Sequence, residues 1–254
     1  RDAIDLSQPE SRVLRDVYEQ FKPDYCFNLH GQRTIFAAGD SPIPATVSFL
    51  APAADPDRTI TTARELAMKL IVIASNNLQA SIAGAVGRYD DGFNINCVGD
   101  YFTAQSTPTV LFEAGHYPLD YKRVETRKHI LSSLMAMSHA IASDSLETIE
   151  TAPYFEIPEN KNHLRDIELY NLRKSPDGMP VFGNNMLIQF KEMKNGDDID
   201  FVPEIVTENK GLLGLQRVNA QEHKTLMNLC FDADDSEIKN LTKTISLLSL
   251  HQFV

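Results

Sequence analysis

The sequence predicts an α/β protein in which a mixed sheet flanked by helices is followed by a small β-rich domain. Over residues 1–145, apolar runs with strand character alternate with long helical patterns, which is typical of an α/β sheet. Beyond residue 154 the apolar runs are short and alternating, and Asn195-Gly196 separates two of them as in a β-hairpin. We therefore expect two domains, at residues 1–145 and 154–254.

The first domain is expected to begin with a helix. Ser7-Gln8-Pro9-Glu10 has the form of a capping box with proline in the first turn, apolar residues follow at helical spacing, and Pro23 ends the pattern. The other elements expected in this domain are, in order, strands over 25–29 and 46–50, a helix over 59–85, a loop over 88–107, a strand over 109–113 and a helix over 120–142. In the second domain we expect strands over 167–172, 186–193 and 199–206 and an amphipathic helix over 236–250.

The composition argues against several kinds of partner. The formal net charge is −11, so neither nucleic acid nor an anionic membrane is expected to bind, because both require a cationic face. No apolar run approaches the ~20 residues of a membrane span. The three cysteines, Cys26, Cys97 and Cys230, have no regular spacing, which argues against a disulfide scaffold and favours a reducing compartment such as the cytoplasm.

Two apolar runs end in side chains that can carry chemistry. Residues 109–112 lead into Glu113, and residues 25–29 lead into His30. Open α/β sheets bind their ligands at strand ends. A His and a Glu in such positions indicate metal-assisted hydrolysis. We expect the two side chains to lie on one rim of one sheet, within a distance on the order of 10 Å.

These segments resemble those of the zinc carboxypeptidases of the carboxypeptidase A type. Asn28-Leu29-His30-Gly31-Gln32 is similar to the segment that carries the family's later zinc-ligand histidine. Pro108-Thr109-Val110-Leu111-Phe112-Glu113-Ala114-Gly115 is similar to the segment that carries its catalytic glutamate. Arg1-Asp2 resembles the end of the family's Asn-Arg pair, which binds the terminal carboxylate of the substrate. The resemblance covers roughly residues 1–142.

The resemblance implies a zinc-dependent enzyme that removes C-terminal residues from peptides or proteins. His30 is then a zinc ligand, Glu113 the general base, and Arg1 a substrate-binding residue. The family also has a substrate-binding tyrosine in the loop before the glutamate, and we identify it with Tyr89 in preference to Tyr101.

The family's His-x-x-Glu zinc motif is absent from this sequence. None of the seven histidines is followed by Glu three positions later. We therefore expect the chain to be a fragment of a catalytic domain, inactive by itself and without a fully bound zinc, or alternatively a pseudo-enzyme. Two other functions remain open: an aspartoacylase-like zinc amidohydrolase acting on N-acyl amino acids, and a non-catalytic peptide-binding module.

The remaining polar residues near these segments are expected to be structural. Asp90, Asp91 and Asp100 are predicted to form the solvated rim of a loop. Arg123 is predicted to lie on the solvated face of a helix, and His116 in an exposed turn.

Overall fold

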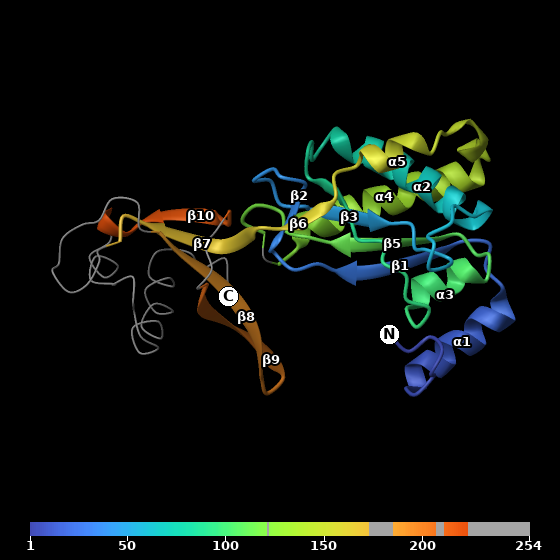
Figure 1. The fold of residues 1–254 in the computed structure, drawn as a ribbon, viewed down its shortest axis with the longest axis horizontal. Coiled ribbons are helices and arrows are strands. Elements are labelled where there is room, and N and C mark those ends of the chain that lie inside the picture. The colour runs from blue at the N-terminus through green and yellow to red at the C-terminus, as the bar shows by residue number, and fades with distance from the viewer. Residues whose placement is uncertain (121, 173–184, 207–210, 223–254) are drawn as a thin grey trace. The chain divides into compact units, whose positions relative to one another are not determined.

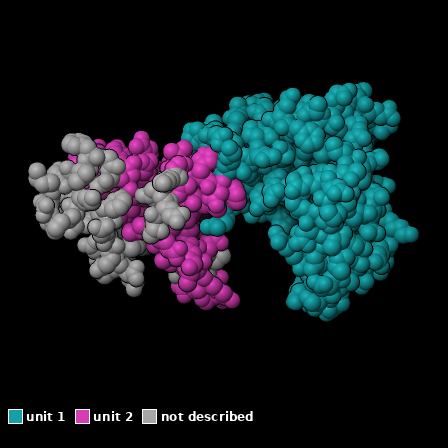
Figure 2. Space-filling view, viewed as in Figure 1, with its two compact units in different colours: residues 1–33, 37–117, 123–161 teal, residues 34–36, 118–122, 162–254 magenta. Residues whose placement is uncertain are grey.

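A computed structural model describes residues 1–120, 122–172, 185–206 and 211–222 of the chain. Figure 2 distinguishes two compact units: residues 1–33, 37–117 and 123–161 form the first, and residues 34–36, 118–122 and 162–254 belong to the second. The predicted α/β class with a mixed sheet is confirmed. The helix expected over 236–250 lies outside the described residues.

The first unit contains a four-stranded mixed sheet and five α-helices (Figure 1). Its elements are α1 (Pro9–Phe21), β1 (Cys26–Gly31), β3 (Val47–Leu50), α2 (Thr62–Gln79), β4 (Val86–Arg88), α3 (Val98–Ala104), β5 (Thr109–Ala114), α4 (Val124–Ala142) and α5 (Ala152–Glu156), with a 3-10 turn at Ser145–Thr148. The strand order is β1-β5-β3-β4. The pairs β1–β5 and β3–β4 are parallel and the pair β5–β3 is antiparallel.

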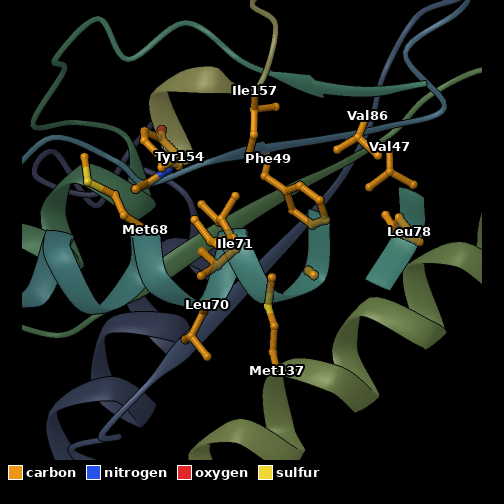
Figure 3. Close-up of a cluster of buried hydrophobic side chains, with 14 of the residues drawn as sticks. Val47, Phe49, Met68, Leu70, Ile71, Leu78, Val86, Met137, Tyr154 and Ile157 are labelled. Carbon is orange, nitrogen blue, oxygen red and sulfur yellow. Dashed lines mark hydrogen bonds between the residues drawn. The ribbon is translucent and has the colours of Figure 1, made fainter. Parts of the chain in front are cut away.

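One face of this sheet forms the main hydrophobic core. Phe49 on β3 and Phe112 on β5 are register partners, and their rings meet edge to face with centroids 5.1 Å apart. Helices α2, α4 and α5 cover this face, and Figure 3 shows their side chains packed against Phe49. The helix residues in this cluster include Met68, Leu70, Ile71, Leu78, Met137 and Tyr154. Because side chains alternate along a strand, the residues next to Phe49 and Phe112 point to the other face.

The second unit contains a four-stranded sheet with its own small core. Its strands are β7 (Leu164–Tyr170), β8 (Met186–Asn195), β9 (Asp198–Val206) and β10 (Leu213–Asn219), in the order β10-β7-β8-β9. The hairpin predicted at Asn195-Gly196 is confirmed: Gly196 takes a φ of 62°, which suits a tight two-residue turn. A separate two-stranded sheet pairs β2 (Phe36–Ala38) with β6 (Asn160–Asn162), and a short 3-10 turn spans Ala220–Glu222.

Two local predictions for the first unit are wrong. The capping box does not form, because the hydroxyl and the backbone N–H of Ser7 both donate to the Asp2 carboxylate, at 2.9 and 3.1 Å, and Gln8 becomes the N-cap of α1. A hydrogen bond from the backbone N–H of Gln8, together with those from Ser7, holds the pKa of Asp2 well below its usual range. The loop expected over 88–107 contains the helix α3, whose seven residues gave too short a pattern to recognise.

Candidate functional site

The two strand-end residues singled out by the sequence lie side by side. His30 on β1 and Glu113 on β5 are register partners in a parallel ladder, so both side chains point to the same face of the sheet. This is the face opposite the Phe49 and Phe112 core. His30 is exposed to solvent, whereas Glu113 is only 8% exposed. The pair therefore joins an accessible imidazole to a buried carboxyl.

Glu113 is a buried carboxyl group without a hydrogen-bond donor. Among the described residues, no side chain or backbone group donates a hydrogen bond to its carboxyl oxygens. Burial removes water from the charged form and raises the pKa of Glu113 from 4.5 to about 7. Near neutral pH such a group exists in both protonation states, which suits it to accept and return a proton.

Tyr89 brings a phenol into the electrostatic field of Glu113. Its backbone N–H donates to the Phe49 carbonyl at 2.9 Å, which fixes the chain directly after β4. Burial raises the pKa of the Tyr89 phenol, the negative charges of Glu113 and Asp90 raise it further, and the positive charge of Arg1 opposes them. The charges of Arg1 and Glu113 therefore both act on the Tyr89 phenol.

An ion pair between the buried Arg64 and the partly buried Asp91 holds the loop that follows Tyr89. The guanidinium of Arg64, which is 2% exposed, lies 2.5 Å from one carboxylate oxygen of Asp91. Arg58 lies 2.8 Å from the other oxygen. The prediction of a solvated rim is therefore wrong for Asp91. Arg64 also donates to the backbone carbonyls of Ala51, at 3.2 Å, and Arg58, which ties α2 to the loop.

Three other residues are more buried than the sequence indicated. Asp100 on α3 is 6% exposed, and burial raises its pKa although the backbone N–H of Asn94 donates to it at 2.9 Å. His116 is 2% exposed. The half-buried Arg123 is not on a solvated face, because its guanidinium donates to the carbonyls of Ala114 and Gln32 at 2.7 and 2.8 Å and so joins the ends of β5 and β1.

A chain of polar side chains beside Glu113 was not predicted. The Ser48 hydroxyl donates to the side-chain carbonyl of Asn160 at 3.0 Å, and the Asn160 amide donates to the side-chain carbonyl of Gln32 at 2.7 Å. The Gln32 amide then donates to the backbone carbonyl of Ala45 at 3.1 Å. A period of two from His30 places Gln32 on its face of the sheet, which was the only available sequence signal.

The described residues do not fit a complete zinc site. A catalytic zinc requires about three protein ligands and an open position for water. Within the described ranges, no group of three His, Cys, Asp or Glu residues lies close enough together to hold a metal ion. His30 supplies one imidazole, so the chemistry available to these residues alone is proton transfer at Glu113 and recognition of anions by Arg1.

No family model, curated protein or solved structure matches this chain. No helix in the described part of the chain is long and apolar enough to cross a bilayer.

Proposed function

We propose that residues 1–145 are part of the catalytic domain of a zinc carboxypeptidase, an enzyme that hydrolyses C-terminal peptide bonds. The observation that carries this proposal is the in-register pair of exposed His30 and buried Glu113, whose carboxyl has a pKa of about 7. A site of this class needs a metal ligand and a carboxylate base close together at a sheet rim. Because His30 is one ligand, a complete zinc site requires further ligands besides those that the described residues supply.

Each residue of the site has a role in this proposal. Glu113 takes a proton from the attacking water and returns it to the leaving amine, which requires a group that ionises near neutral pH. The guanidinium of Arg1 binds the terminal carboxylate of the peptide through two parallel hydrogen bonds. The half-buried Tyr89 phenol, whose pKa the charge of Glu113 helps to raise, donates a hydrogen bond to the bound peptide backbone.

Replacing Glu113 with glutamine in an active form of the protein should lower kcat by at least ~10²-fold. The amide is nearly isosteric but cannot accept a proton, and zinc content should be unchanged because Glu113 is not a ligand in this proposal. Steady-state cleavage of a peptide together with metal analysis measures both quantities. Near-normal turnover in E113Q would show that Glu113 is not the base.

A free carboxylate at the end of the substrate should be required for cleavage. A peptide and its C-terminal amide differ only in the group that Arg1 is proposed to bind, so the amide should be cleaved at least ~10-fold less efficiently in kcat/KM, as expected for a lost charge-assisted pair. Arg1→Gln should remove this discrimination, and Arg1→Lys should keep part of it. Equal cleavage of both peptides would overturn the role of Arg1.

The same assays separate the two alternative functions. Preferential cleavage of N-acyl amino acids would favour the amidohydrolase. Tight binding of a peptide without turnover would favour the peptide-binding module.

A further inference from the structure

The segment that follows Arg1 is held against the loop before α3. The backbone N–H of Ala3 donates to the backbone carbonyl of Asn96 at 3.0 Å. The side-chain oxygen of Asn96 accepts from the backbone N–H groups of Ile4 and Asp5, at 2.8 and 3.4 Å, and its amide donates to the Asp5 carboxylate at 2.5 Å. Asn96 therefore makes four hydrogen bonds to three consecutive residues that are distant from it in the sequence.

Ala3 is also held by a side chain of α1. The guanidinium of Arg15 donates to the Ala3 carbonyl and lies over the Tyr101 ring, 4.0 Å from the ring centroid. Ala3 is only 6% exposed, whereas Arg1, two positions earlier, is exposed to solvent. The backbone next to Arg1 is therefore fixed by two different elements, while Arg1 itself stays accessible.

Asn96 is in turn anchored to a buried carboxyl group. Its backbone N–H donates to the side-chain oxygen of Asn94 at 3.0 Å, and the backbone N–H of Asn94 donates to the carboxyl group of Asp100 at 2.9 Å. Asp100 lies on α3 and is 6% exposed. A series of side-chain oxygens that accept backbone N–H groups thus runs from the buried Asp100 to residues 3–5.

The charge of Arg1 acts on two groups of the first unit. Burial raises the pKa values of Tyr89 and Asp100, and the positive charge of Arg1 opposes both rises. Tyr89 is the residue that we propose as a second contact of the bound peptide. An ordered position of Arg1 therefore bears directly on how the proposed site recognises its substrate.

We propose that Asn96 is a positioning residue for Arg1: it holds residues 3–5 in one conformation and so fixes the place from which Arg1 binds the terminal carboxylate of a peptide. This inference rests on the proposed function in treating Arg1 as the carboxylate-binding residue. Binding by a group that is already in place costs less conformational entropy than binding that must first order the chain. Asn96 should therefore contribute to the affinity for the free carboxylate and not to the binding of the rest of the peptide.

The test is peptide binding by the chain itself, which needs neither zinc nor turnover. N-acetylated dipeptides that end in alanine, phenylalanine, lysine or glutamate are compared with their C-terminal amides, and Kd is measured from NMR chemical-shift changes. The wild type should prefer the free acid by ~10-fold, as expected for a charge-assisted pair. Asn96→Ala should reduce this preference by about 3–10-fold, the cost of ordering a flexible side chain, and should leave the Kd of the amides nearly unchanged.

Three variants make the test specific. In the Asp5→Asn, Asn96→Asp double variant the acid and the amide change places, so both the acceptor for the backbone N–H groups and the side-chain hydrogen bond are retained, and the preference for the free acid should be restored. In an Arg1→Gln background, Asn96→Ala should not change the preference further, because the group that it positions is absent. Asn77→Ala removes an exposed side-chain hydrogen bond between α2 and α4, and as the matched control it should bind both peptides as the wild type does.

The possible results separate this inference from the proposed function. A preference for the free acid that is lost in Arg1→Gln but unchanged in Asn96→Ala would overturn the inference and leave the role of Arg1 standing. Equal weakening of acid and amide binding in Asn96→Ala would also overturn it, since the loss would then be a general one. Equal binding of both peptides by the wild type would overturn the role of Arg1 and the inference together. Near-normal turnover in E113Q, by contrast, contradicts the proposed function and leaves the binding result unaffected.

Discussion

Replacing Glu113 with glutamine should stabilise the folded chain at pH 8 by on the order of 3 kcal/mol and leave its stability at pH 4 nearly unchanged. Burial raises the pKa of Glu113 from 4.5 to about 7, and one unit corresponds to about 1.4 kcal/mol. A raised pKa means that the folded state keeps a proton that the unfolded state has lost. The wild type is therefore most favoured below pH 4.5 and loses this contribution as pH rises through about 7.

The measurement is the thermal midpoint of both proteins at pH 4 and pH 8. A stabilisation of E113Q of this size at pH 8 should raise its thermal midpoint by roughly 6–12 °C for a domain of this size. Glu147 is an exposed carboxyl in the same unit, so Glu147→Gln should follow the wild type at both pH values. A difference between E113Q and wild type that is the same at pH 4 and pH 8 would contradict the prediction, since the effect would then come from packing and not from ionisation.

Replacing Arg64 with methionine should destabilise the first unit by ~3 kcal/mol. Removing one partner of a buried ion pair leaves an uncompensated charge, which costs about 3–5 kcal/mol. We expect the lower end of this range because Arg58 continues to neutralise Asp91, 2.8 Å away. The substitution also removes the hydrogen bond from Arg64 to the Ala51 carbonyl. Thermal or denaturant unfolding of the two proteins gives the difference.

Arg58→Met is the matched control, because it breaks an ion pair with the same carboxylate by the same substitution. Arg58 is 52% exposed, and exposed ion pairs contribute about 0.2–1 kcal/mol. Equal losses in the two variants would show that burial of Arg64 is not what makes its pair strong. Because the Arg64–Asp91 pair fastens the loop after Tyr89, Arg64→Met should also weaken any substrate binding that depends on Tyr89.

These two predictions compare a buried charged side chain that has an ion-pair partner with a buried carboxyl that has none. The buried Arg64 is paired with the partly buried Asp91, and each neutralises the charge of the other. Glu113 is buried without such a partner, which costs stability above neutral pH and keeps the carboxyl reactive. Stability given up at a single position in this way is typical of functional sites.

The sequence by itself determined the class of the fold and its two most important strands. The runs that end in His30 and Glu113 form β1 and β5, because short runs rich in aromatic and β-branched residues and bounded by turn-forming residues favour strands. The hairpin between β8 and β9 was equally clear, since Gly196 readily takes the positive φ that the turn requires. These features depend on local properties of the chain.

Tertiary structure alone decided the environment of each site residue. That His30 and Glu113 are in register depends on how two strands 83 residues apart pair, and hydrophobic patterns specify a face but not a partner. The burial of Arg64 and Asp100 and the contacts of the half-buried Arg123 depend on packing between distant segments, which the sequence pattern does not specify. The bridge from Ser48 through Asn160 to Gln32 joins residues up to 128 positions apart, and no local pattern can reveal such a contact.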